Sequence, residues 1–232
     1  HVILELMTLR RAAHLGVHST LLRPLKITDL MTPTAAVIDA HERTIRAFLE
    51  RNRVEVLPGS GSFVGPGELR VATRMGESTL RARHVVIASG SHPRRPAIIP
   101  FDDRAICDSD TILQMDAIPR SLAVLGGGVI GCEYACMFAE LGVKVTLIDR
   151  RERPLRFLDN DVLDALFASM RRKGIRLLFG ESTQAVRVEP ADRGPRAVVE
   201  LASGRSVRAD RLLVAAGRAP NTAALDLERV GI

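Results

Sequence analysis

Aromatic residues are scarce in this 232-residue chain, which has no tryptophan, one tyrosine and seven phenylalanines. Hydrophobic residues nevertheless make up 46% of it, so its core must be built mainly from aliphatic side chains. An aliphatic core is typical of helices packed on a parallel sheet. The length allows one or two domains.

Cysteine is also scarce, and the three thiols are Cys107, Cys132 and Cys136. An odd number without a C-x-x-C pair excludes both a disulfide framework and a zinc site. Cys132 and Cys136 stand four residues apart in a segment of helical pattern, where thiols usually serve as small buried hydrophobes. We therefore expect neither a redox pair nor a metal site within this chain.

No apolar run reaches the length of a membrane span, and no signal-peptide pattern opens the sequence. We therefore expect a cytoplasmic protein without a membrane partner. The chain begins with His1 rather than methionine and stops just after a helix-like stretch. These ends favour a piece of a longer protein.

The basic residues are almost all arginine: only three of the 33 are lysine. A net charge of +6 would suit a nucleic acid or an anionic ligand. The arginines are spread along the whole chain, without a long run and with few interleaved aromatics. This distribution favours a solvated surface, and no nucleic-acid partner is expected.

The hydrophobic periodicity predicts elements along most of the chain, with residues 16–30 and the proline-rich stretch 93–100 irregular. Helices are expected at residues 1–15, 34–52, 108–115 (capped by Asp108 or Asp110) and 159–173, the last closed by Gly174. Strands are expected at residues 54–57, 62–64, 69–73, 81–87, 175–179 and 211–216, with a β-ribbon over 184–201.

The middle of the chain predicts a strand, a glycine turn, a helix and a second strand. Leu122–Leu125 is an apolar run, Val129–Leu141 has a helical pattern, and Val143–Ile148 is another apolar run. Strands and helices alternate from Ser121 onward, which predicts a parallel, doubly wound sheet and an α/β fold.

The glycine turn fits the pattern G-x-G-x-x-G, with its glycines at Gly126, Gly128 and Gly131. The first permits a tight turn, the second lets a pyrophosphate approach the backbone, and the third lets the helix lie against the sheet. The pyrophosphate is then expected on free N–H groups at the start of the helix, near Val129 and Ile130. The flanking strand and helix support this prediction of a dinucleotide site.

Asp149 ends the second strand, where a carboxylate can accept hydrogen bonds from an adenosine ribose and favours NAD. Arg150 and Arg151 follow it, and a guanidinium pairs with the 2′-phosphate of NADP. Either these arginines are surplus on a solvated loop, or they let the site accept both nucleotides. In the second case, Arg150→Ala plus Arg151→Ala would weaken NADPH binding and spare NADH binding.

Two short motifs flank this unit, ASG at Ala88–Gly90 and GRAPN at Gly217–Asn221. With the glycine turn, they resemble the FAD-dependent pyridine nucleotide–disulfide oxidoreductase family. That family inserts an NAD(P) domain into an FAD domain, with an A-T-G-like crossing into the insert and a G-R-x-P-N crossing out. Ser89 takes the threonine position here.

Within that family, the chain most resembles the soluble, Si-specific pyridine nucleotide transhydrogenases. The stretches that carry this likeness are CDSDTIL (107–113), GGGVIGCEYA (126–135), LIDRRERPLRFLD (147–159) and AAGRAPNT (215–222). The chain departs from the pattern at Cys107, where a tyrosine is expected, and at Pro220, where glycine is common in that subfamily.

The resemblance implies a Rossmann-like, doubly wound NAD(P) domain inserted in an incomplete FAD-binding domain of the same type. Residues 1–109 would be part of the FAD domain, 110–216 the NAD(P) domain, and 217–232 a segment that returns toward the FAD domain. Besides the glycine turn, Asp149 and the two arginines after it, the resemblance places further residues at the bound cofactors: Gly61, Ala88, Ser89, Gly90 and Gly217. It also places Glu133 near the nicotinamide. Glu133 is equally well explained as an ordinary exposed helix carboxylate.

The resemblance also implies hydride transfer between NADPH and NAD through FAD, without a nucleophile or a general base from this chain. The piece alone is expected to be inactive, and the whole protein to be a homodimer or larger homo-oligomer. One alternative is a disulfide reductase such as dihydrolipoamide dehydrogenase or a glutathione- or mercury-reductase relative, with a C-x-x-x-x-C pair upstream of His1. Another is a non-catalytic module that binds nicotinamide dinucleotides.

Overall fold

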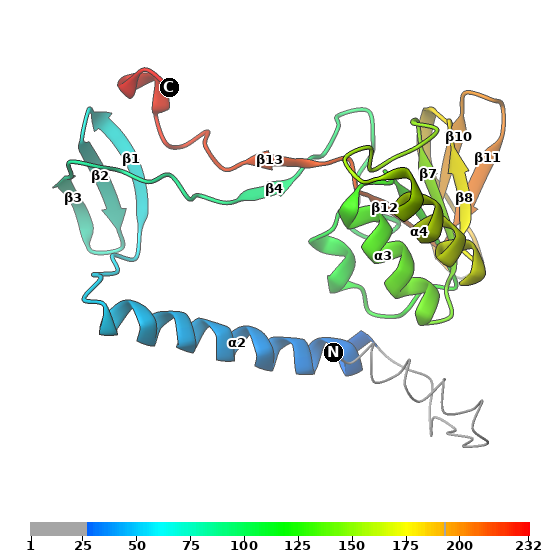
Figure 1. The fold of residues 1–232 in the computed structure, drawn as a ribbon, viewed down its shortest axis with the longest axis horizontal. Helices are drawn as coiled ribbons and strands as arrows, with labels where there is room; N and C mark the ends of the chain where they lie inside the picture. Colours follow the sequence, from blue (N-terminus) through cyan, green and yellow to red (C-terminus); the bar gives the residue numbers. More distant parts are fainter. Residues whose placement is uncertain (1–26, 193) are drawn as a thin grey trace. The chain divides into compact units, whose positions relative to one another are not determined.

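The computed structural model describes residues 27–192 and 194–232, which fall into two compact units (Figure 1). The first unit includes Pro93–Gly217, and the second consists of Ala36–His92 and Arg218–Ile232. The helix predicted at residues 1–15 lies outside the described residues. So does most of the segment 16–30, whose last four residues already belong to a helix rather than to an irregular stretch.

The first unit is built on a five-stranded parallel sheet with the order β5-β12-β6-β7-β8. Its strands are β5 (Ile106–Cys107), β6 (Ser121–Leu125), β7 (Lys144–Asp149), β8 (Arg176–Phe179) and β12 (Arg211–Val214). From β6 the chain moves outward to β7 and β8, then returns to place β12 on the other side of β6. Such a reversal of strand order is where open α/β sheets bind ligands. The α/β class and the parallel sheet are confirmed.

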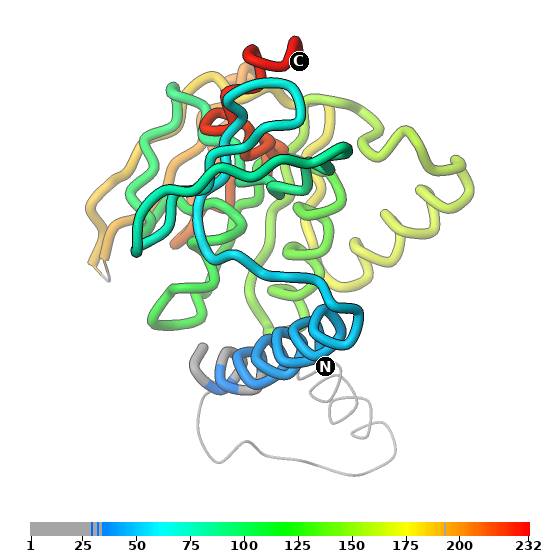
Figure 2. The backbone as a smooth tube through the Cα atoms, turned by 90° about the vertical axis from the view of Figure 1, so that its left-hand side faces the viewer, coloured from blue at the N-terminus to red at the C-terminus, as the bar shows by residue number. Residues whose placement is uncertain are grey.

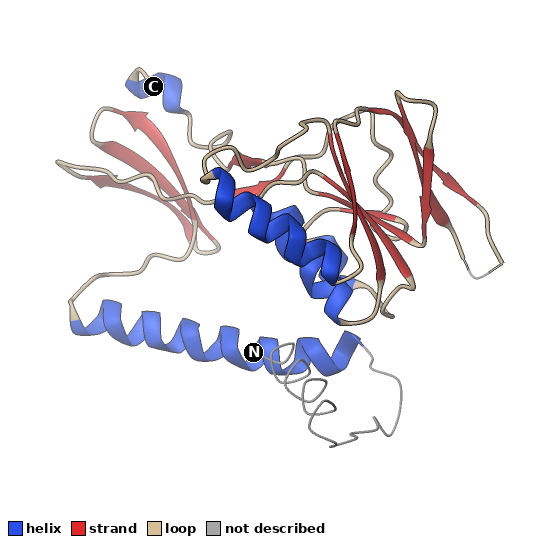
Figure 3. Ribbon diagram, turned by 45° about the vertical axis from the view of Figure 1, so that its right-hand side comes forward, coloured by secondary structure: helices blue, strands red, loops and turns tan. Residues whose placement is uncertain are grey.

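One face of this sheet is covered by α3 (Val129–Glu140) and α4 (Asn160–Arg172), which lie side by side in Figure 3. Successive strand residues point to opposite faces, so Leu122 and Val124 of β6 join the helices in one aliphatic core. Gly174 closes α4 with φ +79°, a left-handed conformation that glycine adopts without strain.

The opposite face is covered by a three-stranded antiparallel sheet rather than by helices. Its strands are β9 (Thr183–Glu189), β10 (Arg196–Leu201) and β11 (Ser206–Ala209). Ala123 of β6 packs in this second core with Val199 and Val207. The sequence predicted only a ribbon here and missed β11, whose four residues carry little periodic signal.

The second unit contains an antiparallel sheet of β1 (Ser60–Gly65), β2 (Glu68–Thr73) and β3 (Gly76–Arg81). The C-terminal segment with the 3-10 helix η3 (Leu227–Val230) lies beside β1, as Figure 2 shows in red and cyan. There the backbone N–H of Phe63 donates to the carbonyl of Leu225 at 2.9 Å.

The chain crosses between the units twice, and the two crossings run together. Strand β4 (Ser91–Pro93) pairs with β13 (Arg218–Pro220). Just inside the first unit, the N–H of Arg94 donates to the carbonyl of Gly217 at 2.9 Å. Residues 94–217 therefore leave and rejoin the remainder of the chain at nearly one point.

Two predicted strands are wrong. Residues 54–57 are irregular, and of residues 81–87 only Arg81, the end of β3, is in a strand. Val86 is 89% exposed rather than entering a core. A strand needs a neighbour to pair its backbone groups. The N–H of Ala82 still donates to the carbonyl of Gly67, but no strand in the described ranges pairs with residues 83–87.

Helix α2 (Ile27–Arg51) begins earlier than the predicted helix at 34–52. Its Glu42 and Arg46 form an ion pair of 2.7 Å one turn apart, while Val37, Ile38, Ile45 and Phe48 are each more than half exposed. Among the helices of residues 27–192 and 194–232, none combines the length and the apolar character of a membrane-spanning segment.

Candidate functional site

The glycine turn joins β6 to α3 and has no room for side chains at two of its positions. Gly126 has φ +112°, and a Cβ there would lie 2.4 Å from the carbonyl oxygen of Ala215. A Cβ on Gly131 would lie 1.8 Å from the carbonyl oxygen of Gly126. These two glycines therefore have the roles in turn and packing that the motif predicted.

Gly128 differs, because a Cβ there would meet no atom within 4 Å. It is the N-cap of α3 and supplies no side-chain cap. The backbone N–H groups of the first helical turn have no partner within the helix, so they face the open side of the turn. This combination fits an anionic group such as a pyrophosphate.

A cavity of about 160 Å³ adjoins this turn. It lies where the order of strands reverses, between the carboxyl ends of β6 and β12. Its lining comprises Pro93, Ser109, Gly128, Val129, Ile130, Val214, Ala215 and Gly217. Four predicted residues thus meet at one cavity: Gly128, Val129, Ile130 and Gly217.

The sequence missed the remaining four lining residues. Ser109 is the one hydroxyl among residues that are otherwise apolar or glycine, and it is 8% exposed. Its carbonyl accepts a hydrogen bond from the Tyr134 hydroxyl of α3 at 2.7 Å. Ser109 stands on a loop beyond β5, and no local pattern links it to a glycine turn that follows later in the chain.

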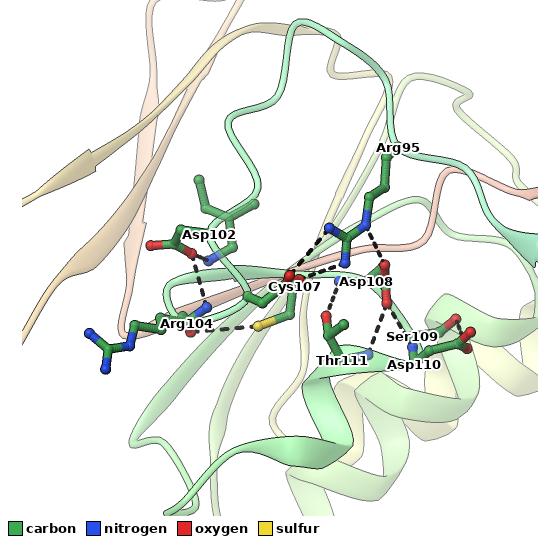
Figure 4. Close-up of polar contacts among 10 residues, drawn as sticks. Arg95, Asp102, Arg104, Cys107, Asp108, Ser109, Asp110 and Thr111 are labelled. Carbon is green, nitrogen blue, oxygen red and sulfur yellow. Dashed lines mark hydrogen bonds and ion pairs between the residues drawn. The ribbon is translucent and has the colours of Figure 1, made fainter.

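The loop that carries Ser109 is fixed by the buried carboxylate of Asp108 (Figure 4). Its Oδ1 accepts the N–H groups of Asp110 and Thr111, each at 2.9 Å, and its Oδ2 accepts Nε of Arg95 at 2.7 Å. Burial alone would raise the pKa of Asp108, but these hydrogen bonds outweigh it and leave the pKa below the ordinary value. Asp110 holds the N-cap position of the short 3-10 helix η2 (Thr111–Gln114) without a side-chain cap, and the carboxylate of Asp108 accepts the N–H of Thr111 instead.

Arg95 ties this loop to a second carboxylate. Its Nη2 donates to Oδ1 of Asp103 at 2.6 Å, and its guanidinium lies 4.9 Å from the centre of the Phe101 ring. Hydrogen bonds to Asp103 and Asp108 raise the pKa of Arg95 further. Arg95 therefore holds the segment from Asp103 to Asp108, which leads directly to Ser109, by charged contacts at both of its ends.

Asp149 ends β7 and is only 4% exposed. Oδ1 of Asp149 accepts two hydrogen bonds from Arg151, one from the backbone N–H at 2.8 Å and one from the side-chain Nε at 2.9 Å. Its Oδ2 accepts the N–H of Gly127 and Nη2 of Arg151, both at 2.7 Å. Burial would raise the pKa of Asp149, but the bonds from Arg151 and Gly127 outweigh it and lower the pKa.

The other arginines of this loop do not share Asp149. Arg150 is exposed and contacts no carboxylate among the described residues. Arg153 pairs with Asp164 of α4 at 2.8 Å. The structure thus brings only Arg151 to the carboxylate at the end of the strand.

The remaining predicted residues lie elsewhere. Glu133 is exposed on α3 and does not line the cavity. Ala88–Gly90 and Gly61 belong to the second unit. There the carbonyls of Ser89 and Gly90 accept hydrogen bonds from Asn221 at 3.1 and 3.0 Å. The ASG and GRAPN motifs therefore meet.

The thiols are enclosed, Cys107 and Cys132 fully and Cys136 in part. Burial raises the pKa of Cys107 and of Cys132 to about 11. In the part of the chain that the structure describes, no group of three or more metal-ligating side chains comes together.

Comparison with known proteins finds one family model along nearly the whole chain, pyridine nucleotide–disulphide oxidoreductase, over residues 6–232. Soluble pyridine nucleotide transhydrogenases of Mycobacterium bovis (strain BCG / Pasteur 1173P2) and Yersinia enterocolitica are 38% and 40% identical to the chain over 206 residues. These alignments cover 88% of this chain and 43% of each relative. The chain therefore spans less than half the length of those relatives.

Two solved structures are also similar. The crystal structure of LpdA from Mycobacterium tuberculosis has a TM-score of 0.87 and 29% identity, over 100% of this chain and 50% of LpdA. The HOCl-induced flavoprotein disulfide reductase RclA from Escherichia coli has a TM-score of 0.66 and 28% identity, over 77% of this chain and 39% of that protein.

Proposed function

The chain belongs to the pyridine nucleotide–disulphide oxidoreductase family, whose flavoproteins use FAD and NAD(P), and from that premise we propose that its glycine turn binds a nicotinamide dinucleotide. One observation carries the proposal. The open backbone at Gly128 stands at the start of α3, beside a cavity at the reversal of strand order. Dinucleotides bind at such points in open α/β sheets.

In this proposal, the chain binds and orients the nucleotide. Backbone N–H groups at Val129 and Ile130 hold the pyrophosphate, while Gly126 and Gly131 keep strand and helix close. The apolar walls from Val214 and Ala215 exclude water from the cavity. When bound, FAD and the nicotinamide supply the hydride-transfer chemistry.

The whole protein is proposed to be a soluble NAD(P) transhydrogenase of the Si-specific type, which passes a hydride between NADPH and NAD through FAD. The two soluble pyridine nucleotide transhydrogenases at 38% and 40% identity support this assignment. Residues 110–216 then form the NAD(P) domain, and residues 1–109 and 217–232 contribute to the FAD domain. The first compact unit, which includes Pro93–Gly217, also contains β5, although β5 precedes the proposed domain boundary at residue 110.

FAD is proposed to lie on the second unit, near Gly61 and the joined motifs at Ala88–Gly90 and Asn221. A Cβ at Gly61 would meet nothing within 4 Å, so the backbone there is open to a ligand. Glu133 stays a proposed neighbour of the nicotinamide, supported only by its place in the helix after the glycine turn. The whole protein is proposed to form a homo-oligomer in the cytoplasm.

A disulfide reductase is the second candidate, because RclA carries that description and is similar in structure. Such an enzyme needs a reactive cysteine pair. Cys132 and Cys136 are a poor pair, because Cys132 is buried with a raised pKa and the two thiols stand on successive turns of α3.

Calorimetric titration of the chain with NAD⁺ and NADP⁺ tests the binding proposal. The unaltered chain should bind at least one of them, and Gly128→Val should abolish binding without lowering the unfolding temperature. Gly65→Val, at another glycine that faces open space, is the matched control and should retain binding. Retained affinity in Gly128→Val would contradict the proposal.

Reduction of thio-NAD⁺ by NADPH in the whole FAD-loaded protein tests the transhydrogenase assignment. Transfer between the nucleotides is expected without an added disulfide. Turnover only in the presence of a disulfide substrate would favour the second candidate.

A further inference from the structure

The carboxylate of Asp149 has no accepting capacity left. An ionised carboxylate offers about four lone-pair positions, and four N–H donors occupy them: two from Arg151 side-chain nitrogens, one from the Arg151 backbone and one from Gly127. Asp149 is 4% exposed, so a ribose hydroxyl reaches this carboxylate only by replacing one of these donors.

Of the four donors, the two on the Arg151 side chain are the ones that can leave. The N–H groups of Gly127 and Arg151 are fixed by the backbone of the turn and of the loop. The Arg151 side chain is 43% exposed, so it can rotate into solvent without opening the core. An adenosine ribose therefore competes with this guanidinium and with nothing else on Asp149.

Arg151 also keeps donors for a ligand. A guanidinium has five N–H bonds in a planar fork, and Asp149 uses two of them. The other three point away from the carboxylate. Because Asp149 already fixes the plane of the fork, a phosphate bound there would cost less side-chain entropy than one bound by a free arginine.

We propose that Arg151 selects between the two nucleotides by occupying on Asp149 the positions that an unmodified adenosine ribose requires, while offering its outer N–H groups to a 2′-phosphate. NAD-type ligands displace the side chain, and NADP-type ligands recruit it. This inference rests on the proposed function, since it assumes that the glycine turn binds the pyrophosphate. It assigns opposite effects on the two nucleotides to one side chain.

The test is the dissociation constant of NAD⁺ and of NADP⁺, measured by calorimetry on the chain and on Arg151→Ala. NADP⁺ should bind about ten to a hundred times more weakly to the variant, because charge-assisted hydrogen bonds are lost. NAD⁺ should bind about two to five times more tightly, because a partly exposed ion pair no longer competes. The gain for NAD⁺ is the decisive result.

Arg156→Ala is the matched control, because it removes the same charge from the same loop at an exposed position without contact to Asp149. It should change the ratio of the two constants less than about twofold. An equal shift in this control would reduce the effect to general electrostatics and overturn the inference.

Arg151→Lys decides the question if Arg151→Ala does not fold. Lysine keeps the charge but lacks the planar fork that spans both carboxylate oxygens, so the same two shifts are expected, each smaller. Weaker binding of both nucleotides, or an unchanged affinity for NAD⁺, overturns the proposal that Arg151 selects between them and leaves the proposed function standing. Failure of the unaltered chain to bind either nucleotide overturns both.

Discussion

Gly131 lies so close to Gly126 that a single added methyl group would overlap the carbonyl oxygen of Gly126, at 1.8 Å. The first turn of α3 therefore rests directly on the backbone that leaves β6. Gly128, between them in sequence, has open space where its side chain would be. The same motif thus contains one glycine needed for packing and one that leaves room for a ligand.

Gly131→Ala should consequently destabilise the protein, by about 1–3 kcal/mol for an overpacked contact. Gly128→Ala should change the free energy of unfolding by less than about 1 kcal/mol, since φ −75° suits any residue. Urea denaturation of the two variants measures both values. Equal losses of unfolding free energy in the two variants would contradict the different packing of Gly131 and Gly128.

Acid should weaken the fold through Asp108 and Asp149, whose folded-state pKa values are both lowered from the ordinary 3.8. Above pH 3.8 both groups are ionised whether the chain is folded or unfolded, and their contribution to stability is complete. As the pH falls through 3.8 and on through the lower folded-state values, the unfolded chain takes up protons first. Stability is therefore lost in that window.

Urea denaturation between pH 7 and pH 2.5 should show this loss. Asp108→Asn should be less stable at pH 7, because the Arg95 guanidinium loses its charged partner, but should lose less on acidification. Asp116→Asn, at an exposed aspartate outside this hydrogen-bond network, should follow the acid profile of the unaltered chain. An Asp108→Asn profile parallel to that of the unaltered chain would count against this role.

Ser109 should contact the nicotinamide half of a bound dinucleotide, since its side chain is the one hydroxyl in the lining of the cavity that adjoins the glycine turn. Ser109→Ala should then weaken NAD⁺ binding about fivefold, the value of one hydrogen bond, and leave ADP-ribose binding unchanged. Ser78→Ala, on the exposed face of β3, is the control. Equal weakening of NAD⁺ and ADP-ribose would place Ser109 at the pyrophosphate instead.

The thiols of the folded chain should resist alkylation. With a pKa of about 11, only about one Cys107 or Cys132 in a thousand is a thiolate at pH 8, and burial restricts access further. Mass spectrometry after brief iodoacetamide treatment should find these two unmodified, with any adduct on the half-buried Cys136. All three should react in urea. Rapid labelling of Cys132 in the folded chain would contradict its burial against the glycine turn.

The strand–turn–helix–strand unit could be predicted from sequence almost to the residue. Its signal is local, because periodicity, glycines and the end of the strand stand next to one another between Ser121 and Asp149. Which apolar segments find a neighbouring strand could not be predicted in this way. Val85, Val86 and Ile87 have the apolar character of a strand, but a strand also needs a partner, and partners are not encoded locally.

The same limit applies to the site. The glycine roles follow from the motif, whereas Ser109 and Ala215 reach the cavity only through the order of the strands. The pairing of Asp149 with Arg151 had a local signal, because an aspartate often accepts the N–H two residues ahead. The sequence pattern predicted a carboxylate and arginines on one loop, but it could not show that Arg151 already occupies Asp149.

The hydrogen bond from Arg94 to Gly217 has a consequence for how the chain assembles. Once residues 94–217 have folded, His92 and Arg218 are held together, so the two parts of the second unit meet across a short connection. The entropy of closing that long loop is then compensated by the aliphatic core around the parallel sheet. The first unit should therefore fold independently. Unfolding the first unit should also release η3 from β1, although both of these elements belong to the second unit.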